Sequence, residues 1–287
     1  MKRKVLNTKS NEEIIEIINK LSSYQMRPSS HGYNDHKGKS IGEASKISIS
    51  DYTSKAIKRP AVALIDVVLA ANRNYNKAVE PKIKHILNNS DIATFKQLDE
   101  FMTKNSKETF FNFWGHQDNK KYNILRSILD AIKVLKGKKN TNDNIKDDYD
   151  LMNKWAIKAN IEERKDDPIG RIENIGIATF QHLRMVFGAN TVKPDQRVIE
   201  VLEREFELMR VSQLNAIKAV EYISKITNKS TLEIDQIFVK YGSGYYNLFD
   251  KENRQIKKGT IEYNIALKLK EKNISNDIIL YSTGINL

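Results

Sequence analysis

The sequence predicts an all-α protein with two helical lobes and a cleft between them. Three observations predict this class. Apolar residues recur with the period of a helix in many stretches, capping signals precede several of these stretches, and one stretch is apolar nearly all round. With 287 residues the chain can bury a sizeable core, so folding does not depend on a metal or on disulfides.

The N-terminal part contains one predicted helix and one predicted loop. Residues 11–26 repeat isoleucine and leucine on one side, and Ser10 or Asn11 is placed to cap the helix. Residues 27–50 contain a proline, three glycines and six serines, so we expect a long loop there. His31 and His36 lack acidic or cysteine partners at a metal-binding spacing, which favours a solvated loop over a metal site.

A nearly continuous apolar run begins at Pro60 and predicts the central buried helix of the first half. Asp66 lies within this run, where an unpaired carboxylate would be costly, so it either has a partner or faces the cleft. The run ends at Leu69-Ala-Ala-Asn72. Helices are then predicted over residues 77–87 and 92–102, the second capped by Ser90 or Asp91.

Aromatic residues at helical spacing, ending at Trp114, are most simply core, and a polar loop with Gly115 and His116 follows them. Residues 123–135 form an amphipathic pattern that ends at a polar run. That run favours a division of the chain. We expect an N-terminal helix and loop (1–50), a first lobe (51–138), a second lobe (139–246) on which the N-terminal helix packs, and a lysine-rich extension (247–287).

A tight turn at Ile172-Glu-Asn174-Ile-Gly176 enters a helical pattern directly. Asn174 tolerates a left-handed backbone, and Gly176 has no side chain to hold a partner at a distance. The free amides of Ile177, Ala178 and Thr179, with the helix dipole, suit a phosphate oxygen, so this turn is expected to bind a nucleic-acid backbone. Nineteen positions after Gly176, Asp195 follows Lys193-Pro194 and heads a second helix.

The later helices follow from the same signals. Residues 213–227 are amphipathic, and Ser230 with Glu233 forms a capping-box pattern that opens a helix through Lys240. One amphipathic helix, residues 261–269, is expected in the C-terminal extension.

The turn, its helix and the Asp195 segment together resemble the helix-hairpin-helix DNA glycosylase superfamily. The resemblance covers roughly residues 55–246 and is carried mainly by residues 170–202. It implies that the hairpin from Asn174 to Thr179, Ile175 included, binds phosphates of double-stranded DNA. It also implies that Asp195 acts on the deoxyribose of a flipped-out base. Glu173 and Asn174 depart from the proline and first glycine of the family's hairpin.

The resemblance also implies roles for residues outside the hairpin. Asn72 stands where an amide approaches the gap left by the extruded base, although an ordinary helix-ending amide explains it equally well. His116 stands where a residue wedges into the DNA stack, and its imidazole can stack on bases. Lys193, next to the catalytic segment, is expected to contact DNA. Asp66 is a weak candidate for the acid that protonates the leaving base.

The resemblance also bears on cofactors. Backbone carbonyls of Gly170, Ile172 and Ile175 stand where some relatives bind Na⁺ or K⁺ at the hairpin. No cofactor is expected to be required. Because the chain has no cysteine, it cannot hold the cysteine-ligated iron–sulfur cluster of other relatives, and it has no disulfides.

Composition agrees with a polyanionic partner without requiring one. The net charge of +12 favours association with DNA, but lysine-rich composition also follows from an AT-rich genome. No apolar run is long enough to cross a membrane, and no secretion signal precedes the first helix, so we expect a cytoplasmic, DNA-associated monomer.

The function predicted from these residues is hydrolysis of the N-glycosidic bond of a damaged, mismatched or modified base. Bifunctional members of the family carry a Schiff-base lysine two residues after the second hairpin glycine, and Ala178 stands there, which favours base release without strand cleavage. Two alternatives remain at this point. The protein is a non-catalytic DNA-binding module that uses the hairpin only for phosphates, or it is a lyase that uses another lysine, such as Lys193.

Overall fold

The computed structural model describes residues 9–27, 36, 38–137, 143–246, 261–275 and 279. Within them the chain is helical, and the only β-type pairing is two isolated bridges, which confirms the all-α class. The first helices are α1 (Asn11–Ser23), α2 (Ile41–Ser50), α3 (Ser54–Lys58), α4 (Pro60–Ala70), the π-helix η2 (Tyr75–Val79), α5 (Glu80–Asn89), α6 (Phe95–Lys104) and α7 (Lys107–Trp114). They are followed by α8 (Asn119–Lys136), α9 (Ile145–Lys158), α10 (Ile177–Val186), α11 (Gln196–Glu205), α12 (Gln213–Thr227), α13 (Thr231–Gly242) and α14 (Ile261–Glu271).

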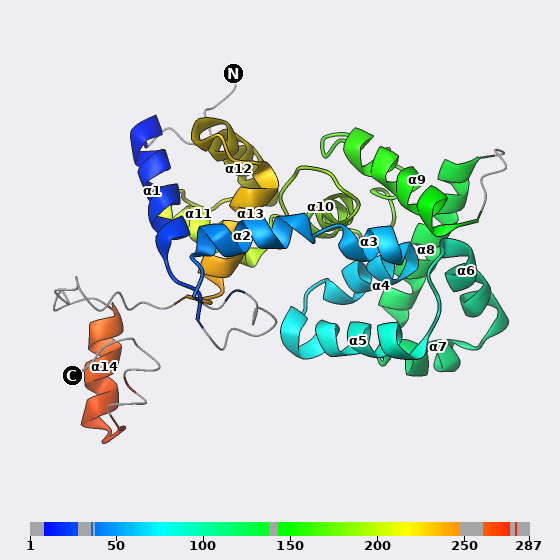
Figure 1. The fold of residues 1–287 in the computed structure, drawn as a ribbon, viewed down its shortest axis with the longest axis horizontal. Coiled ribbons are helices and arrows are strands. Elements are labelled where there is room, and N and C mark those ends of the chain that lie inside the picture. Colours follow the sequence, from blue (N-terminus) through cyan, green and yellow to red (C-terminus); the bar gives the residue numbers. More distant parts are fainter. Residues whose placement is uncertain are drawn as a thin grey trace.

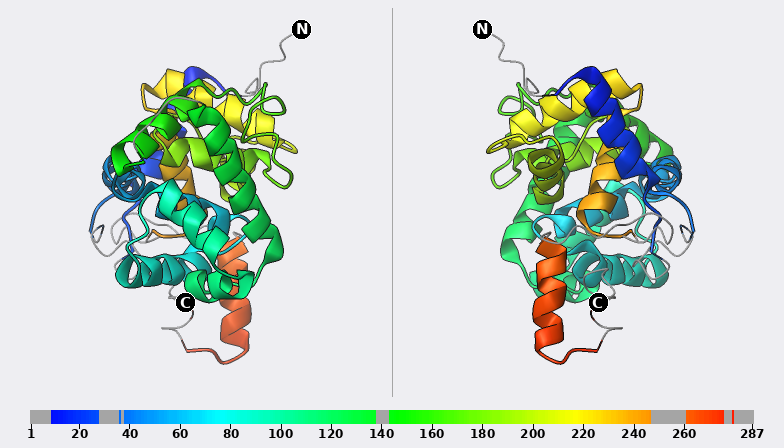
Figure 2. Two further views of the ribbon diagram at one scale, coloured as in Figure 1. Left: turned by 90° about the vertical axis from the view of Figure 1, so that its right-hand side faces the viewer. Right: turned by 90° about the vertical axis from the view of Figure 1, so that its left-hand side faces the viewer.

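Buried apolar residues form two separate clusters. The first is built from α3 to α10, and the second from α1, α2 and α11 to α13. Figure 1 shows the two groups of helices side by side with α10 between them, and Figure 2 shows them from either side. Helix α10 contacts α4 of the first group and α12 of the second, so the element that follows the hairpin turn lies between the two cores.

The division between the clusters falls between Ala189 and Val192. It lies later in the chain than the boundary predicted at residue 138. Residues 145–189 join the first cluster because Met152, Trp155 and Phe180 are buried against it. The polar run that suggested the earlier boundary connects two helices, α8 and α9, that belong to the same core. In the second group, α1 packs on α12 and α13.

Helix α4 is the centre of the first cluster, and all of its residues from Pro60 to Ala70 are buried. It contacts α3, α5, α6, α8, α9 and α10. A helix surrounded in this way must be apolar on every side, which explains the uninterrupted run in the sequence. Asp66 is the one ionisable residue in it.

The prediction of a loop over 27–50 is wrong for its second half. Helix α2 begins after Ser40, whose hydroxyl accepts from the amide of Glu43 at 3.2 Å while the Glu43 carboxylate accepts from the Ser40 amide at 2.7 Å. This capping box outweighs the glycine and serine content of the segment. Gly42 lets α2 approach α1, because a Cβ there would lie 3.2 Å from Cβ of Ser22. His31 lies outside the described residues.

Two further predicted helices begin elsewhere. The segment expected from residue 92 becomes helical only at Phe95, capped by Thr94, because Arg59 donates to the carbonyls of Ser90 and Ile92 and holds them outside the helix. The helix expected from residue 77 starts as the π-helix η2. Pro81 is the second residue of α5, which follows directly, and its missing N–H accounts for the irregular turn before it.

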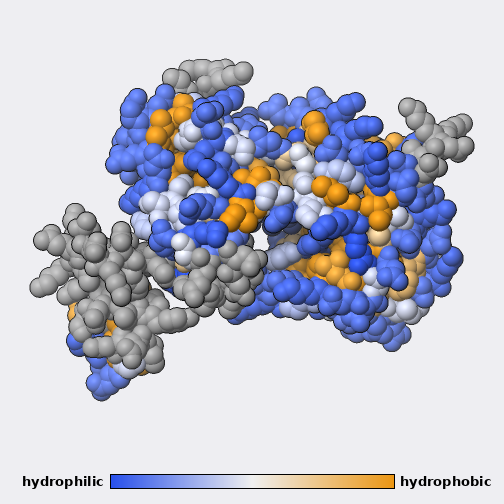
Figure 3. Space-filling view, viewed as in Figure 1, coloured by the Kyte–Doolittle hydropathy of each residue, from blue (hydrophilic) through white to orange (hydrophobic). Residues whose placement is uncertain are grey.

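The remaining helices follow the predictions closely. Helix α12 has the predicted bounds, α13 begins after its Ser230 cap, and α14 begins at the predicted residue. Across the described ranges no helix is both long enough and apolar enough to cross a membrane. The space-filling view shows the surface hollowed below α2, between the two groups of helices (Figure 3).

Candidate DNA-binding and catalytic site

The turn before α10 has an open face. Asn174 adopts a left-handed conformation with φ of 67°, and Gly176 is the N-cap of α10. A Cβ placed on Gly176 would meet no atom within 4 Å. No protein atom therefore crowds the position where a side chain of residue 176 would begin.

The first amides of α10 are available to such a group. Among the hydrogen bonds of the described residues, none is donated by the backbone amides of Ile177, Ala178 or Thr179, and the first amide bonded within the helix belongs to Phe180. Gly176 has no side chain that could cap them. Three free donors and the positive end of the helix dipole point outward, which is a suitable arrangement for an anion.

The segment before the turn is held rigidly against α9. Oδ1 of Asp167 accepts from the amides of Ile169 and Gly170, both at 2.8 Å, and its Oδ2 accepts from Nε1 of Trp155 at 2.9 Å. Gly170 is required here by close packing. A Cβ on it would lie 2.4 Å from the backbone oxygen of Arg164 and 2.9 Å from the Phe180 ring.

The carbonyls predicted to bind a monovalent cation are all occupied by donors of the protein itself. Nη1 of Arg164 donates to the oxygen of Gly170 at 2.7 Å and to that of Ile175 at 2.8 Å. The Ile172 oxygen accepts from the Ile175 amide at 3.1 Å. A guanidinium thus donates to two of the three carbonyls that the sequence assigned to Na⁺ or K⁺.

Asp195 is the N-cap of α11. Its Oδ1 accepts from the amides of Arg197 at 3.0 Å and Val198 at 3.3 Å, which fixes the carboxylate, while Oδ2 lies 3.6 Å from Nζ of Lys193. The Asp195 side chain is 30% exposed and that of Lys193 is 24% exposed. One oxygen is therefore used by the helix, and the other faces a cation and solvent.

The loop that carries Asp195 is supported from three sides. The Lys193 amide donates to Oδ1 of Asp235 at 2.9 Å, Nε2 of Gln181 donates to the Thr191 hydroxyl at 2.8 Å, and Nε2 of Gln213 donates to the Pro194 carbonyl at 3.3 Å. Asp235 belongs to α13, Gln181 to α10 and Gln213 to α12, so each of these three helices makes one hydrogen bond to the loop. The position of Asp195 thus depends on helices of both clusters.

Asp235 is a buried carboxyl, 1% exposed. Burial, and then the charge of Asp195, raise its pKa to about 7, against the lowering effect of the Lys193 amide. Lys240, one helical turn further along α13, has a pKa lowered to about 7 by burial, and it donates to Ser48 and Gln236. The helix beneath the Asp195 loop therefore contains two groups that change charge near neutral pH.

No family model, curated protein or solved structure matches this chain. What this site does is therefore inferred from its own residues.

A second group of polar side chains lies on α3, α4 and η2. Nζ of Lys55 contacts Oδ2 of Asp66, and the Tyr75 hydroxyl donates to the same oxygen at 3.0 Å. Lys55 also lies 3.2 Å from the Tyr75 hydroxyl. Asp66, 8% exposed, is thus compensated by two donors, which agrees with the expectation that it has a partner.

His182 lies on α10, the helix that follows the hairpin turn. Its pKa is lowered well below the usual value by burial and by the charges of Lys193 and Lys55. The ring is therefore neutral. Sequence reasoning did not single out His182 or Lys55, because nothing local distinguishes them from other residues of their helices.

The Asn72 segment leaves α4 at an exposed turn. Asn72 is exposed and left-handed, with φ of 57°. The end of α4 is capped by a lysine from α8, because Nζ of Lys121 donates to the carbonyls of Val68 at 2.7 Å, Leu69 at 3.2 Å and Ala71 at 2.8 Å. Burial, and then the charge of Arg73, lower the Lys121 pKa to about 8. Lys121, also missed by sequence reasoning, is what holds Asn72 at the surface.

The predicted wedge residue His116 is folded back in this structure. Its side chain is 13% exposed, lies beside the Trp114 ring, and has Nε2 3.5 Å from Oδ2 of Asp118. Burial, and then the charge of Arg73, lower its pKa. The neighbouring Gln117 is the exposed side chain of that loop.

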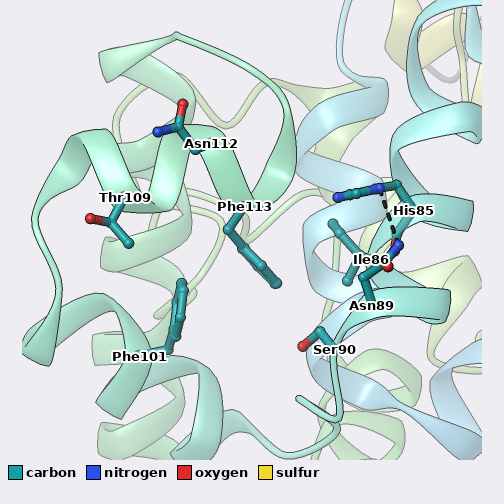
Figure 4. A pocket seen from close by; sticks show the side chains of 8 residues that line it. All are labelled: His85, Ile86, Asn89, Ser90, Phe101, Thr109, Asn112 and Phe113. Atoms are coloured by element: carbon teal, nitrogen blue, oxygen red, sulfur yellow. Dashed lines mark hydrogen bonds between the residues drawn. The ribbon is translucent and has the colours of Figure 1, made fainter.

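Two surface cavities lie apart from these groups. One, of about 300 Å³, is lined by residues of α5, α6 and α7 and of the turn after α5, with Phe101 and Phe113 facing His85 and Asn89 (Figure 4). The other, of about 470 Å³, is lined by α8, α9 and the segment before the hairpin, including Trp155 and Pro168. Neither contains Asp195, the hairpin amides or Asp66.

Proposed function

We propose that this protein is a DNA glycosylase that hydrolyses the N-glycosidic bond of an altered base flipped out of duplex DNA. The observation that carries the proposal is the Asp195 carboxylate, with Oδ1 fixed by the α11 amides and Oδ2 left beside Lys193. A fixed, partly exposed carboxylate is suited to stabilise an oxocarbenium-like sugar and to orient water. The open hairpin on the neighbouring α10 supports DNA as the substrate.

The hairpin holds the DNA backbone in this proposal. The free amides of Ile177, Ala178 and Thr179 bind a phosphate oxygen, and this contact reads no sequence. Arg164 supplies the positive charge behind the turn, so no monovalent cation is required. Exposed Lys165 and Arg171, on either side of the Asp167 anchor, add attraction for the strand.

Asp195 then acts on the sugar. As the bond between C1′ and the base nitrogen breaks, the carboxylate stabilises the positive charge that develops on C1′ and O4′. Water adds to C1′, and its proton passes to the Asp195 carboxylate. The helix amides that bind Oδ1 fix the direction of the carboxylate. The two helical lobes provide the cleft that receives the flipped nucleotide.

One observation favours a second candidate activity. Nζ of Lys193 lies beside Asp195, where the open-chain aldehyde of the abasic sugar would form after hydrolysis. An amine there can form a Schiff base and lead to elimination of the 3′ phosphate. Ala178 has no such group, so any lyase activity would depend on Lys193. Borohydride trapping with wild type and Lys193→Met distinguishes the two activities: hydrolysis alone gives no covalent adduct.

The test of the main proposal is a set of duplexes, each with one altered base, assayed for an alkali-labile site. Wild type is expected to create such a site in at least one of them. Asp195→Asn should reduce the rate by about 100-fold or more, because the charge is lost, while Asn remains a good N-cap and keeps the fold. Binding of every duplex with no base released from any would instead assign the protein to the non-catalytic DNA-binding modules.

A further inference from the structure

The larger of the two surface cavities lies between the end of α8, α9 and residues 159–168, and it contains none of the groups proposed to act at Asp195. We refer to it as the α9 groove. Its lining residues recur along α9 at Leu151, Trp155 and Ala159, so it follows one face of this helix for about 12 Å. About four residues of an extended peptide cover that length. The volume of about 470 Å³ is within the range of cavities that bind ligands.

The floor of the α9 groove is apolar and is already in place without a ligand. It is formed by partly or fully buried side chains of Leu135, Leu151, Trp155 and Pro168. Trp155 is fixed because its Nε1 donates to Oδ2 of Asp167 at 2.9 Å. Oδ1 of Asp167 in turn accepts from two backbone amides, so a ligand does not have to order this part of the groove. A preformed apolar surface leaves more of the free energy of burial for binding.

The rim of the α9 groove carries charges of both signs. Lys154 and Lys158 belong to α9, and both are exposed. Glu163 and Asp166 belong to the segment that runs from α9 to the hairpin, and they are exposed as well. Within the part of the chain that the structure describes, none of these four side chains forms an ion pair or a hydrogen bond. Opposite charges thus line one cavity without pairing with each other, and both signs remain available to a ligand.

We propose that the α9 groove binds a short peptide segment of a partner protein, and that this segment carries an apolar, an acidic and a basic side chain. The apolar side chain packs on the floor at Trp155. The acidic side chain pairs with the two lysines of α9, and the basic one pairs with the carboxylates on the other side of the groove. Burial of the apolar side chain supplies most of the affinity, and the charges at the rim select the sequence. This inference goes beyond the proposed function and does not depend on it.

The charges of the groove disfavour two other occupants. A nucleic-acid strand would place phosphates beside the carboxylates of Glu163 and Asp166, and these like charges repel. A free amino acid has its amine and its carboxylate on one carbon atom, so the two charges are too close together to reach both sides of a groove whose own opposite charges do not pair. A peptide avoids both difficulties, because its acidic and basic side chains start from different residues and each can reach one side.

The experiment selects a displayed library of random peptides on the full-length protein, with peptides of about eight residues so that they span the groove and its ends. We expect the selected peptides to share an apolar, an acidic and a basic residue. One peptide with the shared pattern is then synthesised with a fluorescent label, and its affinity is measured by anisotropy. Its unlabelled form should also change the fluorescence of Trp155, since Trp114, the other tryptophan, is fully buried in the core.

Charge reversal locates the peptide in the groove. Lys158→Glu should weaken binding of the selected peptide by about 10-fold or more, and a peptide with lysine in place of its acidic residue should regain most of that loss. Lys146→Glu is the matched control, because it makes the same change at an exposed position of α9 outside the groove, and it should alter the affinity by less than about 2-fold. Thermal unfolding shows whether each variant has folded, and Lys154→Glu provides the same test if Lys158→Glu does not fold.

Weaker peptide binding in Lys158→Glu but not in Lys146→Glu, with recovery by the exchanged peptide, supports the inference. Equal effects of the two reversals place the peptide elsewhere and overturn it, as does a library that yields no shared pattern. Duplex DNA that displaces the peptide, and whose own binding Lys158→Glu weakens as strongly, would assign the groove to nucleic acid instead. None of these measurements uses base release, so failure of the glycosylase proposal and failure of this inference are distinguishable.

Discussion

The backbone amide of Lys193 donates to Oδ1 of Asp235 at 2.9 Å, so a fully buried carboxyl holds the loop that carries Asp195. The contact joins a residue two positions before the catalytic candidate to the second helical turn of α13. Because Asp195 in turn raises the Asp235 pKa, the two carboxyls are close enough to affect each other. The carboxyl that holds the Asp195 loop in place is therefore also a group that changes its charge near pH 7.

Asp235 should make stability depend on pH in the mildly acidic range. Its folded pKa of about 7 lies above the ordinary aspartate pKa of 3.8, so between these two pH values the folded protein binds a proton that the unfolded chain has lost. Stability gained from this proton is present at low pH and is lost as the pH rises through 7. Between pH 5 and pH 7 the loss amounts to about 2 kcal/mol.

Urea unfolding of wild type and Asp235→Asn at pH 5 and pH 7 measures this contribution. The asparagine keeps an acceptor for the Lys193 amide but does not titrate. We expect the stability of Asp235→Asn relative to wild type to increase with pH across this range. An equal difference at the two pH values would contradict the assigned pKa shift.

The two glycines of the hairpin region should differ in their effect: Gly170 should matter for the stability of the fold and Gly176 for the affinity for duplex DNA. Gly170→Ala places a methyl 2.4 Å from the Arg164 oxygen and should destabilise the protein by about 2 to 3 kcal/mol. Gly176→Ala meets no protein atom and should cost less than about 1 kcal/mol, the cost of a poorer N-cap. The new methyl lies where the phosphate approaches, so duplex affinity should fall by about 10-fold. Calorimetry and a binding titration check the pair, and an unchanged affinity for Gly176→Ala would remove the hairpin from the DNA interface.

Because of the hydrogen bonds of Arg164, we expect duplex binding not to depend on which monovalent cation is present. Its guanidinium already bonds the carbonyls of Gly170 and Ile175, so wild type should bind equally in Na⁺ and K⁺ of the same concentration. Arg164→Ala leaves two carbonyls without a donor and should weaken binding by about 10-fold or more. Arg171→Ala, which removes a nearby exposed charge, is the control. A marked difference between Na⁺ and K⁺ for wild type would show that a cation enters despite Arg164.

Lys121 should contribute more to stability than its neighbour. Lys121→Met removes donors from three carbonyls at the end of α4 and should destabilise the protein by about 2 to 3 kcal/mol. Lys120→Met, at an exposed position one residue earlier, should change stability by less than about 0.5 kcal/mol. Thermal unfolding of both variants provides the comparison. Similar midpoints would show that the Asn72 turn does not depend on this cap.

Local signals in the sequence were sufficient for much of the fold. The run from Pro60 indicated the most buried helix, and Ser230 with Glu233 indicated the start of α13, because burial all round and helix capping depend on neighbouring residues alone. The same capping pattern is present at Ser40 and Glu43, but the glycines and serines around it favoured a loop, and the prediction for this segment therefore omitted α2. The turn at Asn174 and the cap at Asp195 are likewise local features, and they were assigned from their residues.

Several features of the site depend on contacts between distant residues. Arg59 fixes the start of α6, Arg164 fills the expected cation site, and Lys121 caps α4, each by donating to carbonyls that no local pattern associates with it. The wedge role of His116 was assigned from spacing, but the packing of its ring against Trp114 follows from tertiary structure. Wedging by His116 and DNA contact by Asn72 remain predictions.

The sequence by itself determined an all-helical chain, the hairpin turn and a helix headed by Asp195, because periodicity, turn chemistry and capping are properties of short segments. Only the tertiary structure decided that residues 145–189 share the first core, and that Arg164 donates to the carbonyls of Gly170 and Ile175. Which helix faces meet depends on how whole apolar surfaces are buried, and that is settled by the packing of all the helices at once.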